Sequence, residues 1–232
     1  MRLLRAADRF RTRSDGIVAS HCFSFGAHFD PHNTGFGALV ALNDENLEPG
    51  RGYDLHPHRD TEIVTWVVQG TLTHKDSTGR RNDVPAGSVQ RLTAGAGVRH
   101  SERNDSPWQP LRFLQMWLRP DVPGTEPTYA CDAPSLRTGG WTDVVGGSAL
   151  VGVGTSGATL RVARLEASDA VDLPVPARCH VFVATGSVDV AGPGRLDGGD
   201  SLRLSGESAR LTALDSAEVL AWHLPDQDAA ST

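Results

Sequence analysis

Three histidines and a glutamate in the first half of the chain have the types and spacing of a metal site. His56 and His58 are two residues apart, and side chains at this spacing on a β-strand point to the same side. His100 and Glu102 repeat that spacing about 40 residues later. Imidazole nitrogens and carboxylate oxygens that converge on one face form a ligand shell for a divalent metal. We therefore expect a metal centre built by residues 50–104, with the rest of the chain as its scaffold.

Two glutamates compete for the remaining ligand position. On a regular strand Glu62 has the parity of His56 and His58, and Glu102 has that of His100, so both are expected to point inward. A metal ion would offset the cost of dehydrating these carboxylates. One would bind the metal, and the other would lie behind it or accept a proton. The residue types alone leave this choice open.

Three further side chains lie on strands near the predicted metal site. Gln115 points inward on a regular strand, where it either donates to a bound ligand or is satisfied within the core. His74 continues the inward parity of its strand and either orients a ligand or is a satisfied core histidine. Trp66 is interpreted as core packing.

Short strands between glycine and proline turns must position these residues. We predict strands at Gly37–Asn43, Ile63–Val68, Thr71–His74, Ser88–Leu92 and Leu111–Leu118. No helical period of 3.6 residues is evident across this region. The pattern is typical of an antiparallel sandwich or barrel, and the prolines of residues 119–135 indicate a connecting arm.

The second half of the chain loosely repeats the first. The matched segments are His180–Val190 with Thr65–His74, Gly198–Leu204 with Ala86–Leu92, and Glu218–Leu224 with Arg112–Leu118. A duplicated β-domain explains this similarity better than chance does. The copy lacks a pair of alternating histidines and has Arg210-Leu211-Thr212-Ala213 where the first half has His100, so we expect it to be free of metal.

These observations divide the chain into two predicted domains. Residues 1–130 form the metal-binding domain, residues 119–140 form the connecting arm, and residues 141–232 form a degenerate, metal-free domain. The length of 232 residues is sufficient for two small domains with cores of their own.

The composition argues against several functional classes. A formal net charge of −6 without a basic stripe is unfavourable for direct nucleic-acid binding. The longest apolar runs are of strand length, far below the roughly 20 residues of a membrane span. Cys22, Cys131 and Cys179 are odd in number and far apart, which argues against a disulfide framework. Because the first residues also lack a secretory apolar region, we expect a cytoplasmic protein.

The histidine motifs resemble those of a known family. The patterns Gly50-x5-His56-x-His58-x3-Glu62-x7-Gly70 and Gly95-x-Gly97-x2-His100-x3-Asn104 look like the two-part signature of the cupins. The segments His56–Thr65, Thr93–Glu102, Phe23–Phe25 and Phe29–Pro31 resemble the pirin family, and most closely its bacterial quercetin 2,3-dioxygenase-like members. The resemblance extends from the N-terminus to about Tyr129 and then weakens.

This resemblance implies an all-β bicupin, with two antiparallel cupin β-barrels (double-stranded β-helices, or jelly rolls) packed face to face. It implies a metal shell of His56, His58, His100 and Glu102 in the first barrel only, with Glu62 behind it. Either Glu102 or Glu62 would be the catalytic proton acceptor. Such ligands suit Fe(II) best in this context, while Mn, Co, Ni, Cu and Zn also bind nitrogen and oxygen sites.

The implied activity is the opening of a flavonol such as quercetin by O₂, with release of carbon monoxide. The expected partners are therefore a small aromatic enol and O₂, without nucleic acid or membrane, in a monomer stabilised by its own barrel interface. The alternative is a non-catalytic, iron-binding redox sensor that modulates a transcription factor or an enzyme. A metal-dependent isomerase would use the same ligands without oxygen.

Overall fold

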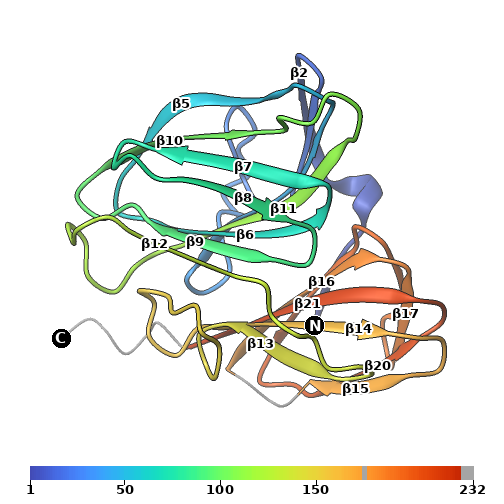
Figure 1. Cartoon of the computed structure of the whole chain (residues 1–232). Coiled ribbons are helices and arrows are strands. Elements are labelled where there is room, and N and C mark those ends of the chain that lie inside the picture. Colours follow the sequence, from blue (N-terminus) through green and yellow to red (C-terminus); the bar gives the residue numbers. More distant parts are fainter. Residues whose placement is uncertain (174–176, 226–232) are drawn as a thin grey trace.

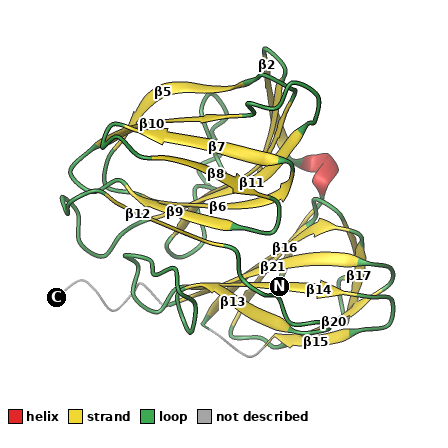
Figure 2. Cartoon of the chain, in the orientation of Figure 1, coloured by secondary structure: helices red, strands yellow, loops and turns green. Residues whose placement is uncertain are grey.

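The computed structural model describes residues 1–173 and 177–225, and its regular structure is almost entirely β (Figure 2). Residues 174–176 and 226–232 of the second predicted domain lie outside the described residues. Within the described part, the only helix is the short 3₁₀ turn η1 (Ala6–Asp8). No helix there has the length and apolar character needed to cross a membrane. The prediction of an all-β fold is confirmed.

The N-terminal unit consists of two facing sheets. The seven-stranded sheet has the order β12 (Thr128–Asp132), β9 (Val89–Thr93), β6 (Glu62–Gln69), β11 (Leu111–Leu118), β4 (Leu39–Leu47), β3 (Ile17–His21) and β2 (Phe10–Ser14). The four-stranded sheet has the order β5 (Gly52–His58), β10 (Val98–Arg103), β7 (Thr71–Asp76) and β8 (Arg81–Pro85). All the strands predicted from the sequence lie in this unit, most of them with shifted ends.

The C-terminal unit has the same construction and lies against the first unit (Figure 1). Its six-stranded sheet has the order β1 (Arg2–Leu4), β19 (Ser201–Ser205), β16 (Arg178–Thr185), β21 (Ala217–Leu224), β14 (Thr159–Leu165) and β13 (Trp141–Val145). Its four-stranded sheet has the order β15 (Ala170–Leu173), β20 (Ala209–Ala213), β17 (Ser187–Val190) and β18 (Gly194–Asp197).

The strand orders of the two units correspond, which confirms the predicted duplication. The order β9-β6-β11-β4 in the first large sheet matches β19-β16-β21-β14 in the second, and the small sheets match strand for strand. The strand at one edge of the large sheet differs between the two units. In the first unit β12, from the predicted connecting arm, pairs with β9, whereas in the second unit β1, from the start of the chain, pairs with β19. The predicted domain boundaries stay a prediction.

The two large sheets share an apolar core. Val64 and Trp66 on β6 belong to the same buried cluster as Phe182 on β16 and Trp222 on β21. The Trp66 indole N–H donates to a carboxylate oxygen of Glu218 at 2.8 Å, across the boundary between the units. The interpretation of Trp66 as core packing is confirmed, and its partners lie in the other unit.

The interiors of the two units differ in chemistry. The interior of the C-terminal unit is filled by aliphatic side chains such as Val181, Val188 and Leu211. In the N-terminal unit an apolar cluster around Val67 and Phe113 occupies only part of the interior. The remaining space contains buried polar side chains, namely Asn43, Glu45, Thr65, His74, Gln90, His100, Glu102 and Gln115. Buried polar groups in this number require partners or a ligand.

Close contact between β5 and β10 depends on a glycine. A Cβ atom at Gly52 would lie 2.5 Å from both the Arg103 Cα and the Glu102 carbonyl oxygen. We expect Gly52→Ala to separate the two strands and to lower the free energy of unfolding by about 1–3 kcal/mol. Urea denaturation measures this loss. Gly152→Ala is the control, because a Cβ there meets nothing within 4 Å; equal stability of the two variants would contradict the prediction.

Candidate metal centre

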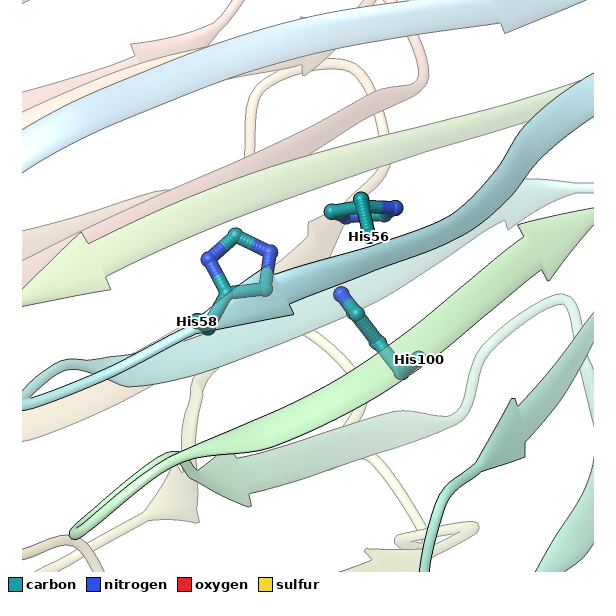
Figure 3. Close-up of side chains that lie close together, drawn as sticks. All are labelled: His56, His58 and His100. Atoms are coloured by element: carbon teal, nitrogen blue, oxygen red, sulfur yellow. The ribbon is translucent and has the colours of Figure 1, made fainter.

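Three imidazoles converge between β5 and β10 (Figure 3). The two strands pair antiparallel with His56 opposite His100, and His58 lies on the same side of β5 as His56. The ring centroids are 4.6–4.9 Å apart, and one ring nitrogen of each residue lies within 4.8 Å of the others. The structure thus brings together the three histidines selected from the sequence.

The electrostatics of His58 and His100 favour neutral rings. Burial, together with the neighbouring imidazoles, lowers the pKa of His58 and of His100 to about 3. Both ring nitrogens of His100 are buried without a hydrogen-bond partner among the described residues. His56 contacts the Asp54 carbonyl oxygen through Nδ1 at 2.7 Å, which leaves its Nε2 for a ligand. Neutral imidazoles with unused nitrogens form a donor set that fits a transition metal.

The Glu102 carboxylate is buried beside this group and is held by two glutamines. Gln90 Nε2 donates to Glu102 Oε1 at 2.9 Å, and Gln115 Nε2 donates to Oε2. Each amide is oriented by an aromatic donor: the Tyr129 hydroxyl donates to Gln90 Oε1 at 2.9 Å, and the Trp117 indole donates to Gln115 Oε1 at 3.0 Å. Gln115 therefore points inward as predicted, where it donates to Glu102.

A fourth imidazole, that of His74, lies next to His100 and Glu102. His74 is fully buried, and one of its ring nitrogens lies within 4.8 Å of ligand atoms of His100 and Glu102. Its Nε2 lies 3.3 Å from Asp76 Oδ2, and this contact fixes the orientation of the His74 ring. The inward direction predicted for His74 is confirmed. Burial raises the pKa of Glu102, while the neighbouring imidazoles of His74 and His56 and the hydrogen bond from Gln115 oppose this rise.

Glu62 does not point into this interior, and the prediction that it shares the side of His56 and His58 is wrong. Its Oε2 accepts a hydrogen bond from Thr93 Oγ1 at 2.9 Å. Its Oε1 lies next to Gly154, in the connection between β13 and β14 of the other unit. Parity fails because the chain turns at Asp60, where φ is 49°, and passes from the small sheet to the large one.

A β-bulge adds residues that the sequence did not indicate. His100 pairs with His56, but Glu102 pairs with Tyr53, so Asp54 and Leu55 of β5 together oppose the single residue Ser101 of β10. The bulge turns Tyr53 inward, where its hydroxyl donates to Glu45 Oε2 at 2.7 Å. Glu45 was missed because the predicted strand ended at Asn43, whereas β4 continues to Leu47.

Burial gives Glu45 a testable pH signature. Desolvation, and to a smaller extent the charges of Glu102 and Asp44, raise the pKa of Glu45 from 4.5 to about 7, although the Tyr53 hydroxyl opposes this shift. Between these values the folded metal-free protein keeps a proton that the unfolded chain has released, so stability falls as the pH rises. Glu45→Gln should remove about 3 kcal/mol of this pH-dependent loss between pH 4 and 8. Urea unfolding of both metal-free proteins at the two pH values measures it, and parallel pH profiles would contradict it.

An aromatic wall borders the histidines. The Trp117 ring meets the His58 ring edge-on at 5.0 Å, and Phe25 packs against Trp117 at 5.1 Å. Phe25 in turn stacks on His21 at 5.0 Å. These rings shield one side of the centre from solvent and give it an apolar surface suited to a flat aromatic molecule.

A duplicated all-β fold with a cluster of histidines inside one unit defines the bicupin class, and comparisons with known proteins identify the family. The Pirin family model matches residues 4–118. A Mycobacterium tuberculosis protein named "Putative quercetin 2,3-dioxygenase" is 43% identical over 227 residues, which cover 95% of this chain and 93% of that protein. The chain belongs to the pirin family.

Further comparisons, one by sequence and two by structure, agree with this family assignment. The Escherichia coli protein named quercetin 2,3-dioxygenase is 42% identical over 127 residues, covering 55% of each chain. The crystal structure of the Escherichia coli pirin YhhW in complex with nickel(II) has a TM-score of 0.89 and 32% identity, and covers 97% of this chain and 98% of that chain. An Acinetobacter baumannii structure titled quercetin 2,3-dioxygenase has a TM-score of 0.78 and 26% identity, with 94% and 84% coverage.

Proposed function

We propose that this pirin is an Fe(II)-dependent dioxygenase that opens the central ring of a flavonol such as quercetin. The observation that carries the proposal is the convergence of three imidazoles beside the buried Glu102 carboxylate. Relatives that match 95% or 55% of this chain are named for the same activity. The net reaction takes up one O₂ and breaks the two ring bonds of the carbon that carries the enol hydroxyl. That carbon leaves as CO.

The residues present fit the metal that the family implies. His56, His58, His100 and Glu102 would hold it, since His100 has no hydrogen-bond partner among the described residues and a Glu102 carboxylate oxygen lies within 4.8 Å of one of its ring nitrogens. Bound there, Fe(II) would supply a redox-active Lewis acid for the reaction of an enolate with O₂.

The side chains of this protein prepare the substrate. Glu102 is the candidate acceptor for the proton of the flavonol 3-hydroxyl, because a carboxylate within hydrogen-bond reach takes such a proton efficiently. Gln90 and Gln115 fix the direction in which its oxygens point. Trp117 and Phe25 offer an apolar surface to the flavonol rings and exclude water from the reacting end.

The direct test combines turnover with product analysis. Protein loaded anaerobically with Fe(II) is mixed with quercetin, O₂ is admitted, and flavonol absorbance and CO are followed. We expect loss of the absorbance with one CO released per O₂ consumed. Absence of both changes with fully loaded protein would refute the dioxygenase proposal, and a partner contact that differed between Fe(II) and Fe(III) protein would then favour the sensor alternative.

A further inference from the structure

The C-terminal unit has a cavity of its own. It measures about 630 Å³ and opens at β13, the edge strand of the six-stranded sheet, in the unit that does not contain the histidine cluster (Figure 1). The residues that line it are Arg137, Trp141, Thr142, Asp143, Ser148 and Arg161. Its volume lies within the roughly 300–1,000 Å³ of small-molecule sites. The cavity therefore has the size for a small organic ligand.

One guanidinium is held in place at this cavity. Arg161 and Asp143 are paired residues of the neighbouring strands β14 and β13, and Arg161 Nε donates to Asp143 Oδ1 at 2.8 Å. The backbone N–H and the hydroxyl of Ser148 both donate to Asp143 Oδ2, at 3.0 and 2.9 Å. Burial alone would raise the pKa of Asp143, but these hydrogen bonds lower it below its usual value. The ionised carboxylate thus orients Arg161 through Nε and leaves its two Nη groups to donate to a ligand.

A second guanidinium at the cavity is unpaired. Arg137 is anchored only through its backbone N–H, which donates to Thr142 Oγ1 at 2.8 Å. Its exposed side chain has no hydrogen-bond or ion-pair partner within residues 1–173 and 177–225. Two guanidiniums and one carboxylate, Asp143, give the described lining a net charge of +1. This charge is complementary to a monoanion.

Trp141 gives the cavity an aromatic surface. Its indole N–H donates to the Asp172 carbonyl oxygen at 3.0 Å, and this bond to β15 fixes the ring. The ring is half-buried, since one part packs against the aliphatic interior of the unit while the rest faces the cavity. A planar ring stacks favourably on an indole, and a planar carboxylate matches the fork of a guanidinium.

We propose that this cavity is a binding site for a small aromatic carboxylate, separate from the metal centre. The carboxylate accepts hydrogen bonds from Arg161 and Arg137, and the ring lies against Trp141. The hydroxyl of Thr142, whose oxygen accepts from the Arg137 backbone, donates to the ligand as well. The site uses none of the residues assigned to the metal centre, so it stands independently of the dioxygenase proposal.

The test compares benzoate with two compounds that each lack one of its features. Benzamide has the same shape without the charge, and acetate has the carboxylate without the ring. Isothermal titration calorimetry at low ionic strength, on protein of equal metal content, measures each affinity. We expect one benzoate per chain, bound at least about tenfold more tightly than benzamide or acetate, because a charge-assisted hydrogen bond contributes about this factor.

Variants locate the binding in the C-terminal unit. Arg137→Gln and Arg161→Gln should each weaken benzoate binding about tenfold and leave benzamide binding unchanged. Arg137→Gln keeps the test valid if Arg161→Gln impairs folding, because the Arg137 side chain supports no other contact in the described chain. Arg195→Gln is the matched control and should bind benzoate like the wild-type protein. It removes an Nε–Asp197 Oδ1 pair of 2.8 Å on β18, outside the cavity.

Three results would each overturn this site. The first is equal affinity for benzoate and benzamide, and the second is equal affinity for benzoate and acetate. The third is a wild-type affinity for benzoate in both cavity variants, which would place the bound anion elsewhere in the protein. None of these measurements depends on flavonol turnover or CO release.

Discussion

His100→Ala is expected to abolish stoichiometric metal binding and to lower flavonol turnover by at least about 10³-fold. This loss exceeds the 10–100-fold that is typical when a residue hydrogen-bonded to a metal ligand is replaced. His100 is the only one of the three clustered histidines that comes from β10, and it is fully buried. Without it, two half-buried imidazoles remain on one strand, too few to bind a metal tightly beside Glu102. Metal analysis after dialysis, together with CO release, measures both effects.

The chain provides a matched control for this substitution. His180 in the C-terminal unit is also buried with both ring nitrogens unpartnered among the described residues, and it packs against Phe23. His180→Ala also removes a buried imidazole, at a comparable packing cost, and should keep a full complement of metal. If His100→Ala retained metal, or if both variants lost it equally, the assignment of His100 as a ligand would fail.

Glu102→Gln is expected to lower turnover by about 10²–10⁴-fold at saturating metal, the range for loss of a general base. The substitution preserves size but removes the negative charge. It also places an amide NH₂ against one of the two donors, Gln90 Nε2 or Gln115 Nε2, so that one hydrogen bond becomes a contact between donors. Turnover against pH, measured alongside metal content, separates loss of the base from loss of the metal.

Glu62→Gln is the corresponding control. Glu62, on β6, is as completely buried as Glu102, on β10, but its side chain lies next to Gly154 of the other unit and accepts a hydrogen bond from Thr93. This variant should keep near-wild-type turnover per bound metal. A result in which Glu62→Gln was inactive and Glu102→Gln active would reverse the roles proposed for the two carboxylates.

Predictions that depended on one continuous strand were reliable. His56 and His58 share β5, and Gln115 shares β11 with Phe113, so alternation alone gave the side on which each side chain lies. The duplication was visible as well, because equivalent turns and strands recur in order along the chain. These features are local, or are repeated often enough to be recognised in a single sequence.

Predictions that crossed a turn or depended on register failed or could not be made. The orientation of Glu62 was inferred through the turn at Asp60, where alternation does not persist. Tyr53 faces inward only because β5 contains a bulge opposite β10, and nothing in the sequence around it marks that extra residue. The pairing of β1 with β19 joins residues about 200 positions apart, which no local pattern encodes.

The position of β1 has a consequence for the integrity of the molecule. The chain begins at the edge of the second large sheet, with Leu3 opposite Leu202, and then crosses to the first unit to form β2. A cleavage in the connecting arm would therefore leave the halves fastened, since the leading segment still bridges them. Conversely, a fragment starting after the arm would present β19 with an unpaired edge, open to pairing with another molecule.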